Sequence, residues 1–286
     1  MTPRVALALA AALAACTPEA PPARRVVAPQ PLSLRAPEEV VVDVAANGDA
    51  LVGRPLPVPE NSDADRTLTV RWLTRTGARP WRLRDAPVID ARYVPHSTAL
   101  LVLTTEHTLV RLDAPEASPV LLDRDVHGPL SLDAAGSRVV YTRGDPPGLE
   151  VVRAEVATGV TTPLAPGLVP AWCPALSPDG SEVLVVASPE GTPSFYRLRE
   201  GAPPTRWNLP SDTPLPTGPT APVIFGDAVV YESDGALRTL GLDGVLRGSL
   251  VGVGLPVYVP GAPTLLTQDA QRRVTPAAPR DLEVTR

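Results

Sequence analysis

The chain has 286 residues, of which 37 are proline, and its formal net charge is −5. Proline is roughly 13% of the chain against a usual ~5%. This excludes a fold built on long helices, because proline removes a backbone donor and clashes with the preceding turn. All 26 basic residues are arginine, so lysine Schiff bases and phosphate-loop lysines are excluded. The absence of a basic stripe argues against a nucleic-acid partner.

The first residues predict export and a lipid anchor. Residues 5–15 form an apolar run of Ala, Leu and Val, which is too short to span a bilayer and is typical of a signal-peptide core. The run ends in Leu-Ala-Ala-Cys16, which resembles the lipobox of bacterial lipoproteins. That resemblance implies a diacylglycerol on the Cys16 sulfur, and several acyl chains together form a stable anchor. The alternative is an ordinary secretory signal with a chance cysteine.

The sequence divides into four segments. We predict a lipoprotein signal peptide over residues 1–15, a Pro/Ala-rich tether over 16–38, a β-propeller over 39–275 and a tail over 276–286. Thr17 stands where an aspartate directs enteric lipoproteins to the inner membrane. By that resemblance we expect the protein on the periplasmic face of the outer membrane.

The clearest repeat unit lies at residues 172–209. Ser-Pro-Asp-Gly180 has the residues of a tight turn, since proline presets φ and glycine accepts a positive φ. Strands are expected over residues 171–176, 182–187, 194–199 and 205–209. The second is apolar on both faces, as in a strand covered on both sides. A four-stranded sheet of this kind cannot bury both faces alone and needs similar sheets beside it, as in a propeller.

The motif W-x-P-x-x-S-P-D-G-S-x-V, followed by F-Y-R-L, resembles the repeat of TolB-type β-propellers. Apolar runs similar to residues 182–187 recur at intervals of roughly 40–50 residues, the spacing of propeller blades. We therefore predict an all-β fold, a β-propeller of six four-stranded blades. Residues 32–34 are a candidate strand to complete the last blade. Five or seven blades are alternatives, and a β-sandwich or two separate sheets would be a different all-β fold.

Catalytic and metal signatures are missing from the sequence. Cys173 lies on an expected strand and is interpreted as a buried, inert thiol. The three histidines, His96, His107 and His127, lack metal-ligand spacing. Residues 61–65 resemble the start of a calcium loop, but Arg66 replaces its glycine, so a solvated acidic loop is the interpretation. We expect no catalytic residue, no metal and no cofactor.

The expected function is a non-enzymatic module that binds another envelope protein as a monomeric propeller. The expected binding surface is a long loop and a nearby aromatic residue, and its candidate residues are Arg54, Asp63, Asp65, Arg66 and Trp81. One alternative is a sensor that binds a carbohydrate or another small ligand in the channel. A further alternative is a hydrolase or lyase that uses acidic residues there.

Overall fold

The structure is a computed structural model that describes residues 39–45, 47–55, 68–73, 87–114, 117–217, 220–258, 265–269 and 274–277. Their regular secondary structure is β-strand. The strands in these ranges are β1 (Val40–Val44), β2 (Ala50–Pro55), β3 (Leu68–Leu73), β4 (Pro87–Tyr93), β5 (Leu100–Thr104), β6 (Leu109–Leu112), β7 (Val120–Asp123), β8 (Val126–Leu132), β9 (Arg138–Arg143), β10 (Glu150–Glu155), β11 (Thr161–Pro163), β12 (Ala171–Leu176), β13 (Glu182–Ala187), β14 (Ser194–Arg199), β15 (Thr205–Arg206), β16 (Val223–Phe225), β17 (Ala228–Ser233), β18 (Ala236–Gly241), β19 (Leu246–Val251), β20 (Val253–Tyr258), β21 (Leu265–Asp269) and β22 (Val274–Ala277).

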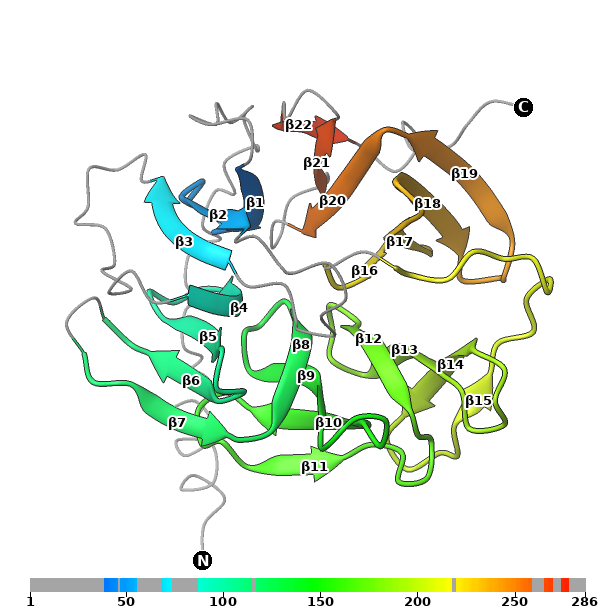
Figure 1. The fold of residues 1–286 in the computed structure, drawn as a ribbon, viewed down its shortest axis with the longest axis horizontal. Coiled ribbons are helices and arrows are strands. Elements are labelled where there is room, and N and C mark those ends of the chain that lie inside the picture. Colours follow the sequence, from blue (N-terminus) through cyan, green and yellow to red (C-terminus); the bar gives the residue numbers. More distant parts are fainter. Residues whose placement is uncertain are drawn as a thin grey trace, which may run out of the picture.

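Hydrogen bonds join these strands into five antiparallel sheets within the described ranges. One sheet has seven strands (β1–β7), three have four (β8–β11, β12–β15 and β16–β19), and one has three (β20–β22). Figure 1 shows the sheets around a common axis, with β1, β4, β8, β12, β16 and β20 innermost. Each inner strand contacts the next one, and β20 contacts β1, so the ring is closed. The fold is therefore an all-β β-propeller, which confirms the predicted class.

The strands of the sheet β12–β15 agree closely with those predicted from the sequence. Its first three strands have the predicted bounds, while β15 ends at Arg206 instead of residue 209. The Trp207 amide still donates to the carbonyl of Phe195 on β14, but the Leu209 amide donates to the carbonyl of Trp207 instead of to β14, so the pairing ends there. The turn before β13 has Gly180 at φ +71°, a conformation that glycine adopts without steric cost.

Side chains of β13 point alternately into two different cores. Val183, Val185 and Ala187 belong to a buried cluster shared with the sheet β8–β11. Leu184 and Val186 belong to another cluster, shared with the sheet β16–β19. Successive strand residues face opposite sides of a sheet, so a run that is apolar throughout can serve both neighbours. The interpretation of this run as a strand covered on both faces is confirmed.

The first and last sheets are held together by apolar and polar contacts. Val41, Val44 and Val52 pack with Val257 and Leu266 in one buried cluster. The side chain of Gln268 on β21, which is 4% exposed, donates to the carbonyl of Glu39 at 3.0 Å. The candidate closing strand at residues 32–34 lies outside the described ranges. None of the described residues forms a helix with the length and hydrophobicity to cross a membrane.

Candidate functional site

Polar side chains on the inner strands bind backbone amides of the next inner strand. Three such links run in order around the ring, between residues that are 50, 40 and 45 positions apart in the chain. They are Asp43 Oδ2 with Tyr93 N (2.7 Å), Asp90 Oδ2 with Leu130 N (2.9 Å) and Ser131 Oγ with Leu176 N (3.0 Å).

Each acceptor in these three links lies where the pairing of its strand with the next shifts register. A β-bulge interrupts the ladder and re-aims a side chain. The bulges therefore direct Asp43, Asp90 and Ser131 toward the next inner strand, where each accepts a hydrogen bond that holds two inner strands together.

The first two links also contain a buried charge cluster. Arg92 lies 3.2 Å from a carboxylate oxygen of Asp90, and it donates to the carbonyl of Val42 at 3.0 Å. Burial raises the pKa of Asp43 to about 6, and the charge of Arg92 offsets only part of that effect. A carboxyl with a raised pKa beside an arginine is a common feature of functional sites, but structural networks produce it too. Here both aspartates have backbone amides as partners, so their primary role is to join neighbouring inner strands.

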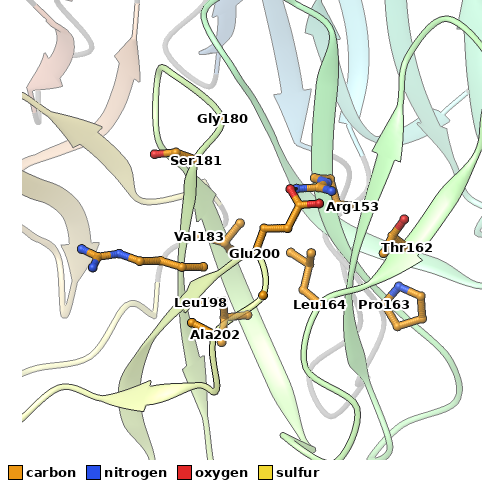
Figure 2. Close-up of a pocket in the computed structure, with 12 residues that line it drawn as sticks. Arg153, Thr162, Pro163, Leu164, Gly180, Ser181, Val183, Leu198, Glu200 and Ala202 are labelled. Carbon is orange, nitrogen blue, oxygen red and sulfur yellow. The ribbon is translucent and has the colours of Figure 1, made fainter.

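A pocket lies between the sheets β8–β11 and β12–β15 (Figure 2). Its apolar side chains are Leu164, Val183 and Leu198, of which Val183 and Leu198 belong to the core between these sheets. Its volume is about 150 Å³, below the ~300–1,000 Å³ of most drug-sized ligand sites. The pocket is large enough for a compact molecule, since an engineered cavity of about this volume binds benzene.

An ion pair spans one side of this pocket. Arg153 Nη1 lies 3.1 Å from Glu200 Oε2, and Figure 2 shows the Glu200 side chain reaching toward Arg153 beside Leu164 and Leu198. The side chain of Arg153 is 12% exposed, while that of Glu200 is 72% exposed. The hydrogen bond from Arg153 lowers the pKa of Glu200. The pocket therefore combines an apolar wall with a largely buried guanidinium.

Two histidines that are distant in the sequence meet near the start of β8. The ring centroids of His107 and His127 are 4.4 Å apart. His107 Nδ1 lies 3.0 Å from the carbonyl of Val126, and His127 Nε2 lies 3.1 Å from that of Gly144. A carbonyl can only accept, so both of these ring nitrogens donate. Across the described ranges, no three His, Cys, Asp or Glu side chains are grouped so that they could hold a metal ion.

Most of the residues that the sequence singled out lie where the structure gives no description. Cys16, Asp63, Asp65, Arg66 and Trp81 lie outside the described residues. Arg54 is exposed near the end of β2, opposite Thr69 of β3.

Cys173 is 7% exposed, and burial raises the pKa of its thiol to about 12. It is a free cysteine with φ +50°, placed in the bulged part of β12. Its burial confirms the expectation from the sequence. A thiol with so high a pKa has almost no thiolate at neutral pH, which makes it a poor nucleophile.

Sequence reasoning missed the links between inner strands, the His107–His127 pair and the Arg153–Glu200 ion pair. A usable signal existed for Asp43 and Asp90, because each is a charged residue with apolar residues on both sides in its strand. Such residues are rarely buried unless they have a partner. The sequence offers no signal for Tyr93 and Leu130, whose amides come from the next inner strand.

No protein-family model matches the sequence, and no curated protein matches it in sequence. Solved structures are similar in fold. TolB from Acinetobacter baumannii matches 79% of this chain with a TM-score of 0.53 and 14% identity, and the chain covers 63% of that protein, less than two thirds. A putative TolB from Agrobacterium tumefaciens matches 74% of the chain, covered over 81% of its own length, with a TM-score of 0.53 and 17% identity.

The calcium-binding protein regucalcin from Agrobacterium tumefaciens is also similar. It matches 80% of this chain and is covered over 80% of its own length, with a TM-score of 0.55 and 12% identity. At these identities the likeness shows the fold alone, because one fold hosts many functions.

Proposed function

We propose that the protein is a lipid-anchored β-propeller of the bacterial cell envelope that binds another envelope protein without catalysing a reaction. The observation that carries this proposal is the order of the chain, in which a lipobox-like segment ending at Cys16 precedes a Pro/Ala-rich stretch and then a propeller. The fold similarity to two TolB structures supports it. The proposed location is the periplasmic face of the outer membrane.

The buried aspartates of the ring have structural partners, which supports a binding role without catalysis. Asp43 and Asp90 accept hydrogen bonds from backbone amides of neighbouring strands, so these groups already stabilise the ring. Loops between the strands of a propeller are free to vary without changing its core, and such loops commonly bind partners. We propose that the partner contacts the loop that follows Arg54, including Asp63, Asp65 and Arg66, together with Trp81.

We also propose that the ring has six blades, with β1–β3 and β4–β7 counted separately. Only two residue pairs, Leu68 with Val88 and Thr69 with Pro87, join β3 to β4. A buried cluster lies between β1–β2 and β4–β5, with Leu51 and Leu100 among its members. If β1–β3 and β4–β7 lay in one plane, their faces could not pack against each other to form this core. An experimental density map with β1–β7 in one plane would refute this count.

The anchor is tested by growing cells with an alkyne-tagged fatty acid and purifying the protein. We expect label on the wild-type chain and its recovery with outer-membrane vesicles. Cys16→Ser should remove the label and release the protein into the soluble periplasmic fraction. Equal labelling of both proteins would refute lipidation at Cys16.

The partner is tested by cross-linking intact cells and purifying the full-length chain. We expect one envelope protein to be enriched over background, and we expect Arg54→Ala and Trp81→Ala to reduce its recovery several-fold. Arg206→Ala is the matched control, because Arg206 is an exposed arginine on β15. Enrichment that is unaffected by the first two variants would move the binding surface elsewhere, and no enrichment would refute the proposal.

A further inference from the structure

The pocket between β8–β11 and β12–β15 has the chemistry of a binding site for a small organic acid. Leu164, Val183 and Leu198 supply an apolar wall, and Arg153 supplies a positive charge beside it (Figure 2). Convergence of an apolar surface and one well-placed charged group is typical of small-ligand sites.

The guanidinium of Arg153 has more N–H donors than its hydrogen bond to Glu200 uses. A guanidinium carries five N–H groups in a planar fork, and the interaction found for Arg153 within the described residues is one hydrogen bond from Nη1 to Glu200. A carboxylate binds arginine best through two parallel hydrogen bonds. The remaining N–H groups of Arg153 therefore leave room for a second carboxylate without loss of the existing bond.

Glu200 is placed as an internal competitor for such a ligand. Its carboxylate accepts one of the hydrogen bonds that Arg153 can donate. The Glu200 side chain is nevertheless 72% exposed and belongs to the turn after β14. Because the Glu200 partner is exposed, this ion pair contributes little to stability. A ligand carboxylate can therefore displace Glu200 or bind next to it at small cost.

The size of the pocket limits the ligand. A volume of about 150 Å³ matches a cavity that holds benzene, which corresponds to a branched chain of four or five carbons. We propose that this pocket binds a small free carboxylic acid with a compact apolar tail, the tail lying against Leu164, Val183 and Leu198 and the carboxylate on Arg153. This site is independent of the proposed envelope partner, which is expected on other loops.

The test uses the full-length chain and 4-methylpentanoate as the probe. Binding is followed through the methyl NMR signals of Leu164, Val183 and Leu198, with an expected dissociation constant on the order of millimolar for so small a ligand. The uncharged amide of the same acid should bind about tenfold more weakly or worse, because it lacks the charge that strengthens a hydrogen bond to arginine.

Two variants should move the affinity in opposite directions. Arg153→Gln should weaken binding about tenfold or more, whereas Glu200→Gln should strengthen it by removing the competing carboxylate. A purely structural ion pair would not produce this opposition, since both variants break the same bond. Arg247→Gln is the control, because it breaks a comparable ion pair with Asp227 on another sheet and should leave binding unchanged.

Three outcomes would overturn the proposal. The first is no shift of the three methyl signals at saturating probe. The second is weaker binding in Glu200→Gln. The third is binding of a peptide that ends in leucine but not of the free acid, which would make the occupant a peptide terminus. If Arg153→Gln fails to fold, the Glu200→Gln result still decides.

Discussion

The side-chain amide of Gln268 bridges the two ends of the propeller, because it donates to the carbonyl of Glu39 at 3.0 Å across 229 positions of the chain. Its oxygen lies 3.4 Å from the backbone N–H of Val41. One buried side chain of the last sheet therefore serves a backbone group of β1 and one of the residue just before it. It reinforces the apolar contact of Val41 and Val44 with Val257 and Leu266.

Replacing Gln268 should weaken this closure. Gln268→Leu keeps much of the side-chain volume but leaves the Glu39 carbonyl and the Val41 amide without this partner. We expect the free energy of unfolding to fall by about 1–3 kcal/mol, measured by urea denaturation. Gln268→Glu is the matched comparison: it can accept from Val41, but its ionised carboxylate would be buried against the Glu39 carbonyl, so we expect a loss at least as large at neutral pH. The loss should shrink at acidic pH, where the protonated carboxyl can again donate to Glu39. Full stability of Gln268→Leu would contradict the role assigned to this side chain.

Asp43 should make the stability of the protein depend on pH. Burial raises its pKa from 3.8 to about 6, so the folded state favours the protonated carboxyl. Its stabilising contribution is therefore fully present below pH 3.8 and is lost as the pH rises through about 6. Asp43→Asn keeps an oxygen for the Tyr93 amide and removes the charge. We expect the stability of the variant relative to wild type to rise by roughly 1–2 kcal/mol between pH 5 and pH 8.

Asp90→Asn provides the comparison for that experiment. Asp90 accepts from the amides of Ala91 and Leu130 and from Arg92, and an amide side chain offers only one acceptor oxygen. We expect this variant to lose about 1–3 kcal/mol at both pH values. An Asp43→Asn variant that behaved like Asp90→Asn would show that the Asp43 charge is needed for the fold.

Gly136 should be sensitive to substitution because its backbone approaches the neighbouring sheet. Its φ is +69°, and a Cβ would lie 2.8 Å from the carbonyl oxygen of Pro95 in the turn after β4. Gly191 has φ +80° with open space around it. Both alanine variants carry the cost of a positive φ, but only Gly136→Ala adds a clash. We expect thermal or urea unfolding to show a further loss of about 1–3 kcal/mol for Gly136→Ala, and equal losses would rule out the clash.

Cys173 should resist thiol reagents while the protein is folded. Burial raises its pKa to about 12, and its side chain is almost inaccessible. In a Cys16→Ser background, Cys173 is the only thiol left. We expect no labelling by a disulfide reagent at pH 8 over the time in which the urea-unfolded chain reacts completely. Complete reaction of the folded protein within minutes would mean that β12 opens readily.

The fold could be predicted from the sequence because each second strand carries its own signal. The run Glu182–Ala187 is apolar on both faces and follows a turn whose residues favour it, so local chemistry and global packing agree. The fourth strand of this sheet was less well predicted, since β15 ends at Arg206. It lies at the sheet edge and carries little apolar pattern.

The candidate site could not be predicted in the same way. Arg153 and Glu200 meet across two sheets, and Asp43 and Tyr93 meet across two inner strands, so both contacts depend on how the strands are arranged around the ring. A bulge of one residue directs the side chains of Asp43 and Asp90, and the sequence does not mark the position of a bulge. The aspartates themselves stood out among apolar neighbours, but the groups they bind did not.

The alternation of β13 side chains between two cores affects how the protein unfolds. In an open array of repeats, a terminal unit can melt while the rest persists. Here Val183 packs against one neighbouring sheet and Leu184 against the other. Every inner strand of the closed ring contacts an inner strand on each side. Loss of any one sheet would bare apolar surface on two others, so we expect denaturation to be a single cooperative event, with every spectroscopic probe reporting the same midpoint.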